Sequence, residues 1–141
     1  MLFRTFILAF TILAATGLQA QDQSLIGMGK MEVEDVVKKH YRDFSRDQSI
    51  VKQEFNYLKY INGSGTMTWI IYFNDDDICT STKKVCDYTE YDFVLDELNE
   101  NYESVGDMQW EYSIDKQTYS VTLEEKDWYF SVRERVKKNK K

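Results

Sequence analysis

Apolar side chains recur at helical spacing in two stretches of the chain. In residues 31–46 they stand three and four positions apart behind an acidic first turn, which predicts a helix there. A second helix is predicted from Thr89, because Asp92 follows three positions later in an approximate capping box. The apolar positions of the two predicted helices are Val33, Val36, Val37, His40, Tyr41 and Phe44, and then Tyr91, Val94, Leu95, Leu98 and Tyr102.

The remaining apolar stretches are typical of strands. Residues 55–61 and 66–73 are rich in aromatic and β-branched side chains and flank Asn62-Gly63-Ser64-Gly65, which predicts a hairpin. A third strand, 78–82, is expected after the acidic turn at residues 74–77. Strict alternation then predicts a three-stranded meander with one face on the core, whose inward positions are Met108, Trp110, Tyr112 and Ile114, Tyr119, Val121 and Leu123, and Trp128, Phe130 and Val132.

The order of these elements is the same in both halves of the chain, a helix followed by three strands. The predicted fold class is therefore α+β. We expect two helix-plus-three-strand repeats that form one curved antiparallel sheet of five or six strands, with both helices packed on one face.

The ends of the chain differ from this body. Residues 1–20 carry Arg4 and a short apolar run from Phe6 to Ala15, followed by small residues, which is typical of a secretory signal peptide. That run is too short to span a bilayer. The predicted organisation is a signal peptide at 1–20, an N-terminal linker at 21–30, a single domain at 31–134 and a basic tail at 135–141. The protein is then expected in the periplasm or outside the cell, with no transmembrane segment after cleavage.

The charge of the 141-residue chain, −6 overall, is unevenly distributed. Residues 21–132 carry 11 basic and 23 acidic side chains, whereas residues 133–141 carry six basic ones and one acid. An acidic body excludes the electrostatic footprint of a nucleic-acid-binding domain. The basic tail is either a solvated terminus or a weak contact to an anionic surface.

Two resemblances follow from the element order and from short stretches of sequence. The repeated helix and strands resemble the fold of the β-lactamase-inhibitor protein and of small outer-membrane assembly lipoproteins, whose repeats open with stretches similar to Gly27-Met28-Gly29-Lys30-Met31-Glu32-Val33. The chain also resembles short uncharacterised exported proteins of Bacteroidetes, in which an aromatic hairpin runs into an Asn/Asp turn and a cysteine, as in residues 69–79. The lipoproteins' attachment cysteine is missing here, and neither resemblance assigns a functional residue.

The sequence offers few of the side chains that enzymes commonly use as catalytic groups or metal ligands. His40, the single histidine, lies within the apolar stripe of the first helix and is expected to pack in the core, with a general base or ligand as the alternative. One histidine and two cysteines do not make an ordinary zinc site. The acidic turn Asp75-Asp76-Asp77 lacks the spacing of a calcium loop, so a solvated turn is expected there. No metal and no cofactor is predicted.

Cys79 and Cys86 stand seven positions apart in a chain predicted to be exported. An oxidising compartment favours a disulfide between them, which would close a short loop before the second helix. Two free thiols are the first alternative. A redox pair is the second, although such pairs usually have the spacing Cys-x-x-Cys.

The aromatic excess is the most suggestive positive feature, with ten Tyr, eight Phe and three Trp. The candidate binding residues are tyrosines whose strand neighbours already claim the inward face, Tyr57, Tyr60, Tyr72 and Tyr129. Cross-strand packing is the alternative role for them. The sequence thus favours an exported non-enzymatic binding module that holds a protein or peptide by its sheet face or edge. The alternative is a small secreted hydrolase that uses His40 or an acidic pair.

Overall fold

The structure, a computed structural model, describes residues 24–49 and 54–139. The predicted signal peptide therefore lies outside the described residues. The elements in chain order are α1 (Lys30–His40), β1 (Phe44–Arg46), β2 (Tyr57–Asn62), β3 (Met67–Phe73), β4 (Cys79–Cys86), the 3₁₀ turn η1 (Tyr88–Glu90), α2 (Tyr91–Asn101), β5 (Glu103–Gly106), β6 (Gln109–Ile114), β7 (Gln117–Glu125) and β8 (Phe130–Val136).

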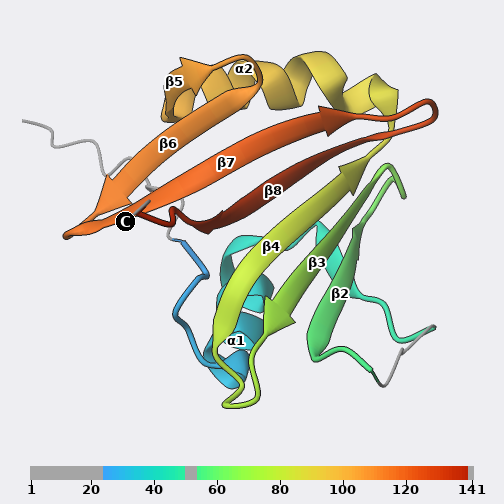
Figure 1. Ribbon diagram of the computed structural model, residues 1–141. Coiled ribbons are helices and arrows are strands. Elements are labelled where there is room, and N and C mark those ends of the chain that lie inside the picture. Colours follow the sequence, from blue (N-terminus) through green and yellow to red (C-terminus); the bar gives the residue numbers. More distant parts are fainter. Residues whose placement is uncertain (1–23, 50–53, 140–141) are drawn as a thin grey trace, which may run out of the picture.

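All of these strands belong to one sheet in the order β1-β2-β3-β4-β8-β7-β6-β5, and every neighbouring pair is antiparallel. The predicted α+β class with an antiparallel sheet is confirmed. Figure 1 shows β4 and β8 side by side, where the two halves of the chain meet, and α2 along the half that contains β6 and β7. The sheet has eight strands rather than five or six. The two strands that the sequence did not predict are β1 and β5, which have three and four residues and no alternating pattern of burial.

The first helix is shorter than its apolar periodicity predicts. It ends at His40, and Phe44 lies in β1 opposite Asn62 of β2. The periodicity is misleading because the Phe44 ring reaches the core from the strand, where its centroid lies 5.5 Å from that of Trp69. The capping box predicted for the second helix is wrong, because the N-cap of α2 is Glu90 and its side chain makes no capping hydrogen bond. Asp87 caps the preceding turn η1 instead, where its carboxylate accepts the backbone N–H of Thr89 at 2.8 Å.

One face of the sheet carries the core, and we call it the core face. Directly opposed residues of antiparallel strands share a face. One row of such partners crosses the sheet, and it consists of Leu58, Ile71, Thr82, Glu134, Val121 and Trp110. Val33 and Val37 of α1 are buried in one cluster with Leu58 and Ile71. A second cluster contains side chains of α2 and of the strands β6 to β8, among them Val94, Leu98, Trp110, Val121 and Phe130.

The chain segment before α1 differs from the expected linker. Leu25 is 3% exposed and Met28 8% exposed, and both belong to the first core cluster. Gly29 forms an isolated antiparallel bridge with Ile78. At the other end β8 runs to Val136, so its last two residues fall within the stretch predicted as a basic tail. The sequence did not predict that residues 24–29 pack in the core, because the apolar side chains there follow neither helical nor strand periodicity.

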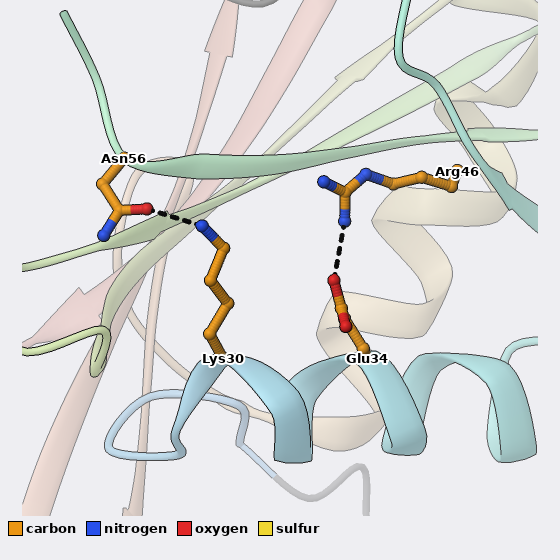
Figure 2. Close-up of polar contacts among 4 residues, drawn as sticks. All are labelled: Lys30, Glu34, Arg46 and Asn56. Carbon is orange, nitrogen blue, oxygen red and sulfur yellow. Dashed lines mark hydrogen bonds and ion pairs between the residues drawn. The ribbon is translucent and has the colours of Figure 1, made fainter. Parts of the chain in front are cut away.

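Polar contacts attach α1 to the strands beside it. Figure 2 shows Lys30 and Glu34 pointing from the helix toward Asn56 and Arg46. The Lys30 Nζ donates to Asn56 Oδ1 at 2.8 Å, and Arg46 pairs with Glu34 at 3.1 Å. Asn56 in turn donates to Asp77 Oδ1 at 2.6 Å, which ties the acidic turn to the same cluster. The acidic turn is therefore held by a hydrogen bond to Asn56.

Candidate functional site

A groove crosses the core face between the end of α1 and α2, above β3, β4 and β8. We call it the interhelical groove. Its larger part has a volume of about 410 Å³, and a smaller hollow of about 70 Å³ continues it. The two parts share five lining residues, Tyr41, Lys84, Leu98, Tyr102 and Val132. Concave sites with a mixed apolar and polar lining are the usual places for ligands.

Trp69, on β3, lines the smaller hollow of the groove. Its side chain is 4% exposed, and its ring meets those of Tyr41 and Phe44 edge-on, with centroids 4.9 and 5.5 Å away. The indole N–H is buried and has no hydrogen-bond partner among the described residues. Leaving a buried donor unpaired costs about 1–3 kcal/mol, so this group is a candidate contact for an acceptor atom of a ligand.

Lys84 supplies the positive charge of the groove. It lies on β4 between its cross-strand partners Trp69 and Val132, and its Nζ stands 4.9 Å from the Trp69 ring centroid. No carboxylate lies within ion-pair distance of it in the described part of the chain. A half-buried ammonium over an indole ring is stabilised by the ring quadrupole and keeps its three donors for other partners.

Carboxylates line the rim of the larger part of the groove, on both of its walls. Asp43 follows α1, and Glu90 and Glu97 belong to the α2 side. Glu90 accepts a hydrogen bond from the Thr66 hydroxyl at 2.7 Å, which fixes its position. The groove thus combines donors on its floor with acceptors on its rim.

Glu134 lines the smaller hollow and accepts hydrogen bonds from two other chain segments. Its Oε1 accepts hydrogen bonds from the hydroxyl of Ser24, at 2.9 Å, and from the hydroxyl of Tyr112. Burial and the neighbouring carboxylate raise the pKa of Tyr112, so its proton stays on the phenol and is donated to Glu134. This network joins residues 110 positions apart in the chain and closes the end of the groove.

The structure does not bring the four predicted binding tyrosines together. Tyr57 and Tyr72 are cross-strand partners with ring centroids 6.5 Å apart, on the face opposite the core. Tyr60 is 6% exposed on the core face, with the Arg46 guanidinium 5.7 Å from its ring centroid. Tyr129 lies in the turn between β7 and β8. Of the four, only Tyr57 and Tyr72 lie next to each other on the sheet face opposite the core.

The expected burial of His40 is wrong. The side chain is exposed at the last position of α1, while Val33 and Val37 form the buried stripe. The stripe is narrower than the periodicity predicts because the helix ends there. Among the described residues no hydrogen bond or ion pair joins His40 to a carboxylate or hydroxyl group, and no three metal-ligating side chains form a group.

The predicted disulfide between Cys79 and Cys86 is also wrong. Both thiols are free and buried, at the two ends of β4. Seven residues of strand span about 23 Å, whereas a disulfide needs Cα atoms roughly 4.4–6.8 Å apart. A bulge next to Phe73 shifts the register, so both side chains reach the core face. Burial raises the pKa of Cys79 to about 12 and that of Cys86 to about 11.

Trp128 was expected on the inward face of a strand, and the structure places it elsewhere. It is 88% exposed in the turn before β8, which begins at Phe130. Alternation gives the parity of a strand but not its first residue. The turn predicted at residues 124–127 therefore lies two residues later, at 126–129. Of the groove residues, Lys84 lies beyond the predicted third strand, 78–82, so the sequence assigned it no face. Trp69 lies inside the predicted strand 66–73, but nothing in the local pattern marks it as a binding residue.

Comparison of the chain with protein-family models, with curated proteins and with solved structures finds no match. None of the helices in the described ranges is long and apolar enough to cross a membrane. The case for a function therefore rests on the geometry of the groove and of the sheet.

Proposed function

We propose that the protein is an exported, non-enzymatic binding module that holds a short peptide segment of a partner protein in the interhelical groove. The observation that carries the proposal is the buried Trp69 indole N–H, which has no hydrogen-bond partner among the described residues. It lies at the smaller hollow of about 70 Å³, beside Lys84, which forms no ion pair within those residues and also lines the larger part of about 410 Å³. Folding alone disfavours unpaired buried donors. A ligand acceptor would satisfy both groups.

The proposed arrangement of the fold supports this site. Two units, each a helix followed by its strands, form the sheet, and both helices pack on the core face. The residues that α1 and α2 contribute to the two core clusters support that arrangement. The helix ends then form the walls of a groove whose floor is the β3-β4-β8 part of the sheet.

A peptide matches the chemistry of this groove. Its carbonyl or carboxylate oxygens accept hydrogen bonds from Lys84 and Trp69 on the floor, and a basic side chain is attracted to Asp43 and Glu97 on the rim. Docking at a sheet edge is less favourable, because the edge strands β1 and β5 have only three and four residues. The face is therefore the better place than the edge for a peptide.

Selection from a displayed library of random 12-residue peptides tests the proposal, with fluorescence anisotropy to measure the affinity of the enriched peptides. We expect enrichment of peptides with a basic residue. Lys84→Met, which keeps the side-chain stem on Trp69, should weaken their binding at least about tenfold. Trp69→Phe, which removes the N–H and keeps a ring, should weaken it about threefold to tenfold.

Lys116→Met is the matched control, since Lys116 lies exposed in the turn between β6 and β7. Its effect on affinity should stay below twofold. Circular dichroism and thermal melting of each variant show that the fold is intact. Enriched peptides that bind Lys84→Met and Trp69→Phe as tightly as the unchanged protein would contradict the groove as the site.

A small hydrolase is the second candidate function, and it has less support. His40 is exposed and is not among the residues that line the groove, although its neighbour Tyr41 is. Turnover of a peptide or ester substrate that is lost in His40→Ala with an unchanged melting temperature would favour the hydrolase over the binding module.

A further inference from the structure

The face of the sheet opposite the core carries a group of basic side chains at the junction of β4 and β8. We call Lys83, Arg133 and Arg135 the basic patch. Lys83 and Arg133 are direct cross-strand partners, and Arg135 follows two residues later on the same face, opposite Ser81. Arg133 and Arg135 are exposed and Lys83 is half-buried. The patch lies in the middle of the sheet, on β4 and β8, with three further strands on either side.

The patch is unfavourable for folding when it is empty. Like charges directly opposed across an antiparallel pair destabilise a sheet. No member of the patch has an ion pair within residues 24–49 and 54–139. Lys126, with which the Glu124 carboxylate is paired, is the larger cause of the lowered pKa of Glu124, to which Lys83 and Arg133 also contribute. The positive charge of the patch is therefore left for an outside partner.

The surroundings of the patch suit an extended chain with anionic groups. The next cross-strand partners of Arg133 and Arg135 on β7 are Thr122 and Ser120, small hydroxyl residues that leave the guanidinium groups accessible. Side chains two residues apart on a strand stand about 6.6–6.8 Å apart on one face. Carboxylates at every second position of an extended peptide have the same spacing, so two of them can meet Arg133 and Arg135 together, each in a bidentate pair.

We propose that the basic patch docks an extended acidic segment of a partner protein, independently of the interhelical groove. An anionic membrane is a poorer occupant, because residues 21–132 carry 11 basic and 23 acidic side chains and an extended anionic surface repels this body. A peptide segment meets only the patch. The acidic partner also explains why three like charges are grouped on a face of an otherwise acidic protein.

The test uses a fluorescein-labelled peptide with Glu at every second position and Ser between, and a matched peptide with Gln in place of Glu. Anisotropy at low ionic strength should show binding of the Glu peptide alone. The double variant Arg133→Gln/Arg135→Gln should weaken that binding at least about tenfold. The control Lys38→Gln/Lys39→Gln makes the same change in charge on exposed positions of α1 and should change the affinity less than twofold.

Equal weakening by the two double variants would overturn the proposal, because the attraction would then be unspecific. Binding of the protein to vesicles with 30% anionic lipid that depends on Arg133 and Arg135, without binding of the Glu peptide, would overturn it in favour of a lipid surface. Self-association in sedimentation velocity that depends on the same arginines, again without peptide binding, would overturn it in favour of a second copy. Unchanged binding of the Glu peptide by Lys84→Met would support the independence of the patch from the groove.

Discussion

The two faces of the sheet place lysines of the same strand in opposite electrostatic surroundings. On β4, Lys84 points to the core face and its ammonium is held over the Trp69 ring, while its neighbour Lys83 points to the other face and meets Arg133. One lysine is accommodated by an aromatic partner, and the other is placed against a like charge. Both faces therefore carry polar groups that folding does not satisfy, a donor in the groove and cations in the patch. This difference teaches that burial alone does not locate the sites of this protein.

The thiols of β4 offer the largest expected effect. Cys79 and Cys86 face the core, so their native alkylation should be at least about a thousandfold slower than in denaturant, since labelling requires opening of the core. In Ser81→Cys the new thiol lies on the opposite face of the same strand and should react quickly. Mass spectrometry after timed labelling measures all three rates. Fast native labelling of Cys86 would contradict its place in the core.

The same thiols predict the response to alkaline pH. Because their folded pKa values are raised to about 12 and about 11, the unfolded thiols ionise first as the pH rises above about 9. Their contribution to the free energy of unfolding is therefore fully present below pH 9 and falls as the pH approaches 11 to 12. Cys79→Ala should flatten this alkaline loss in urea titrations at several pH values. An unchanged slope would contradict the raised pKa of Cys79.

Phe130→Ala should have the next largest effect, a loss of about 3–5 kcal/mol in the free energy of unfolding. The ring is fully buried and packs against Tyr91 at a centroid distance of 5.2 Å, so its removal leaves a cavity in the second cluster. The neighbouring Tyr129→Ala is the control and should cost less than about 0.5 kcal/mol, because Tyr129 is exposed. Similar losses for the two variants would show that the strand parity is wrong.

Tyr112→Phe should lower the free energy of unfolding by about 1.5–3 kcal/mol, as expected for a hydrogen bond to a charged group. The hydroxyl donates to Glu134, while the ring remains stacked on Tyr102 and Tyr119, with centroids 4.9 Å from each. Tyr72→Phe on the opposite face is the matched control, with a smaller expected change. Denaturant unfolding of both variants gives the difference between a satisfied core-face network and an open-face tyrosine.

Lys83→Gln should have the smallest effect and the opposite sign. Removing the like charge opposite Arg133 should stabilise the protein by about 0.2–1 kcal/mol at low salt. The gain should shrink at 1 M salt, where charges are screened within about 3 Å. Thermal melting at both salt concentrations measures it. A destabilised Lys83→Gln variant at low salt would remove the argument that the empty patch is unfavourable.

Much of the local structure was predictable from residues close together in sequence. The apolar spacing of Val33 and Val37 and of Val94 and Leu98 correctly located both helices, and Asn62-Gly63-Ser64-Gly65 correctly located the hairpin. The errors arose where the spacing of apolar side chains is compatible with two different local structures. Phe44 continues a helical stripe and also suits an edge strand, and Trp128 matches the parity of β8 although the strand begins two residues later.

The candidate sites were beyond such reasoning, because distant strands assemble them. Local periodicity determined the helices, most strands and the antiparallel α+β character of this protein. The pairing of β4 with β8 came only from the tertiary structure, and it sets Lys83 against Arg133 and Lys84 beside Val132. The physical reason is that alternation tells which side chains share a face, whereas the choice of neighbouring strand depends on how the two cores pack. Both the interhelical groove and the basic patch follow from that choice.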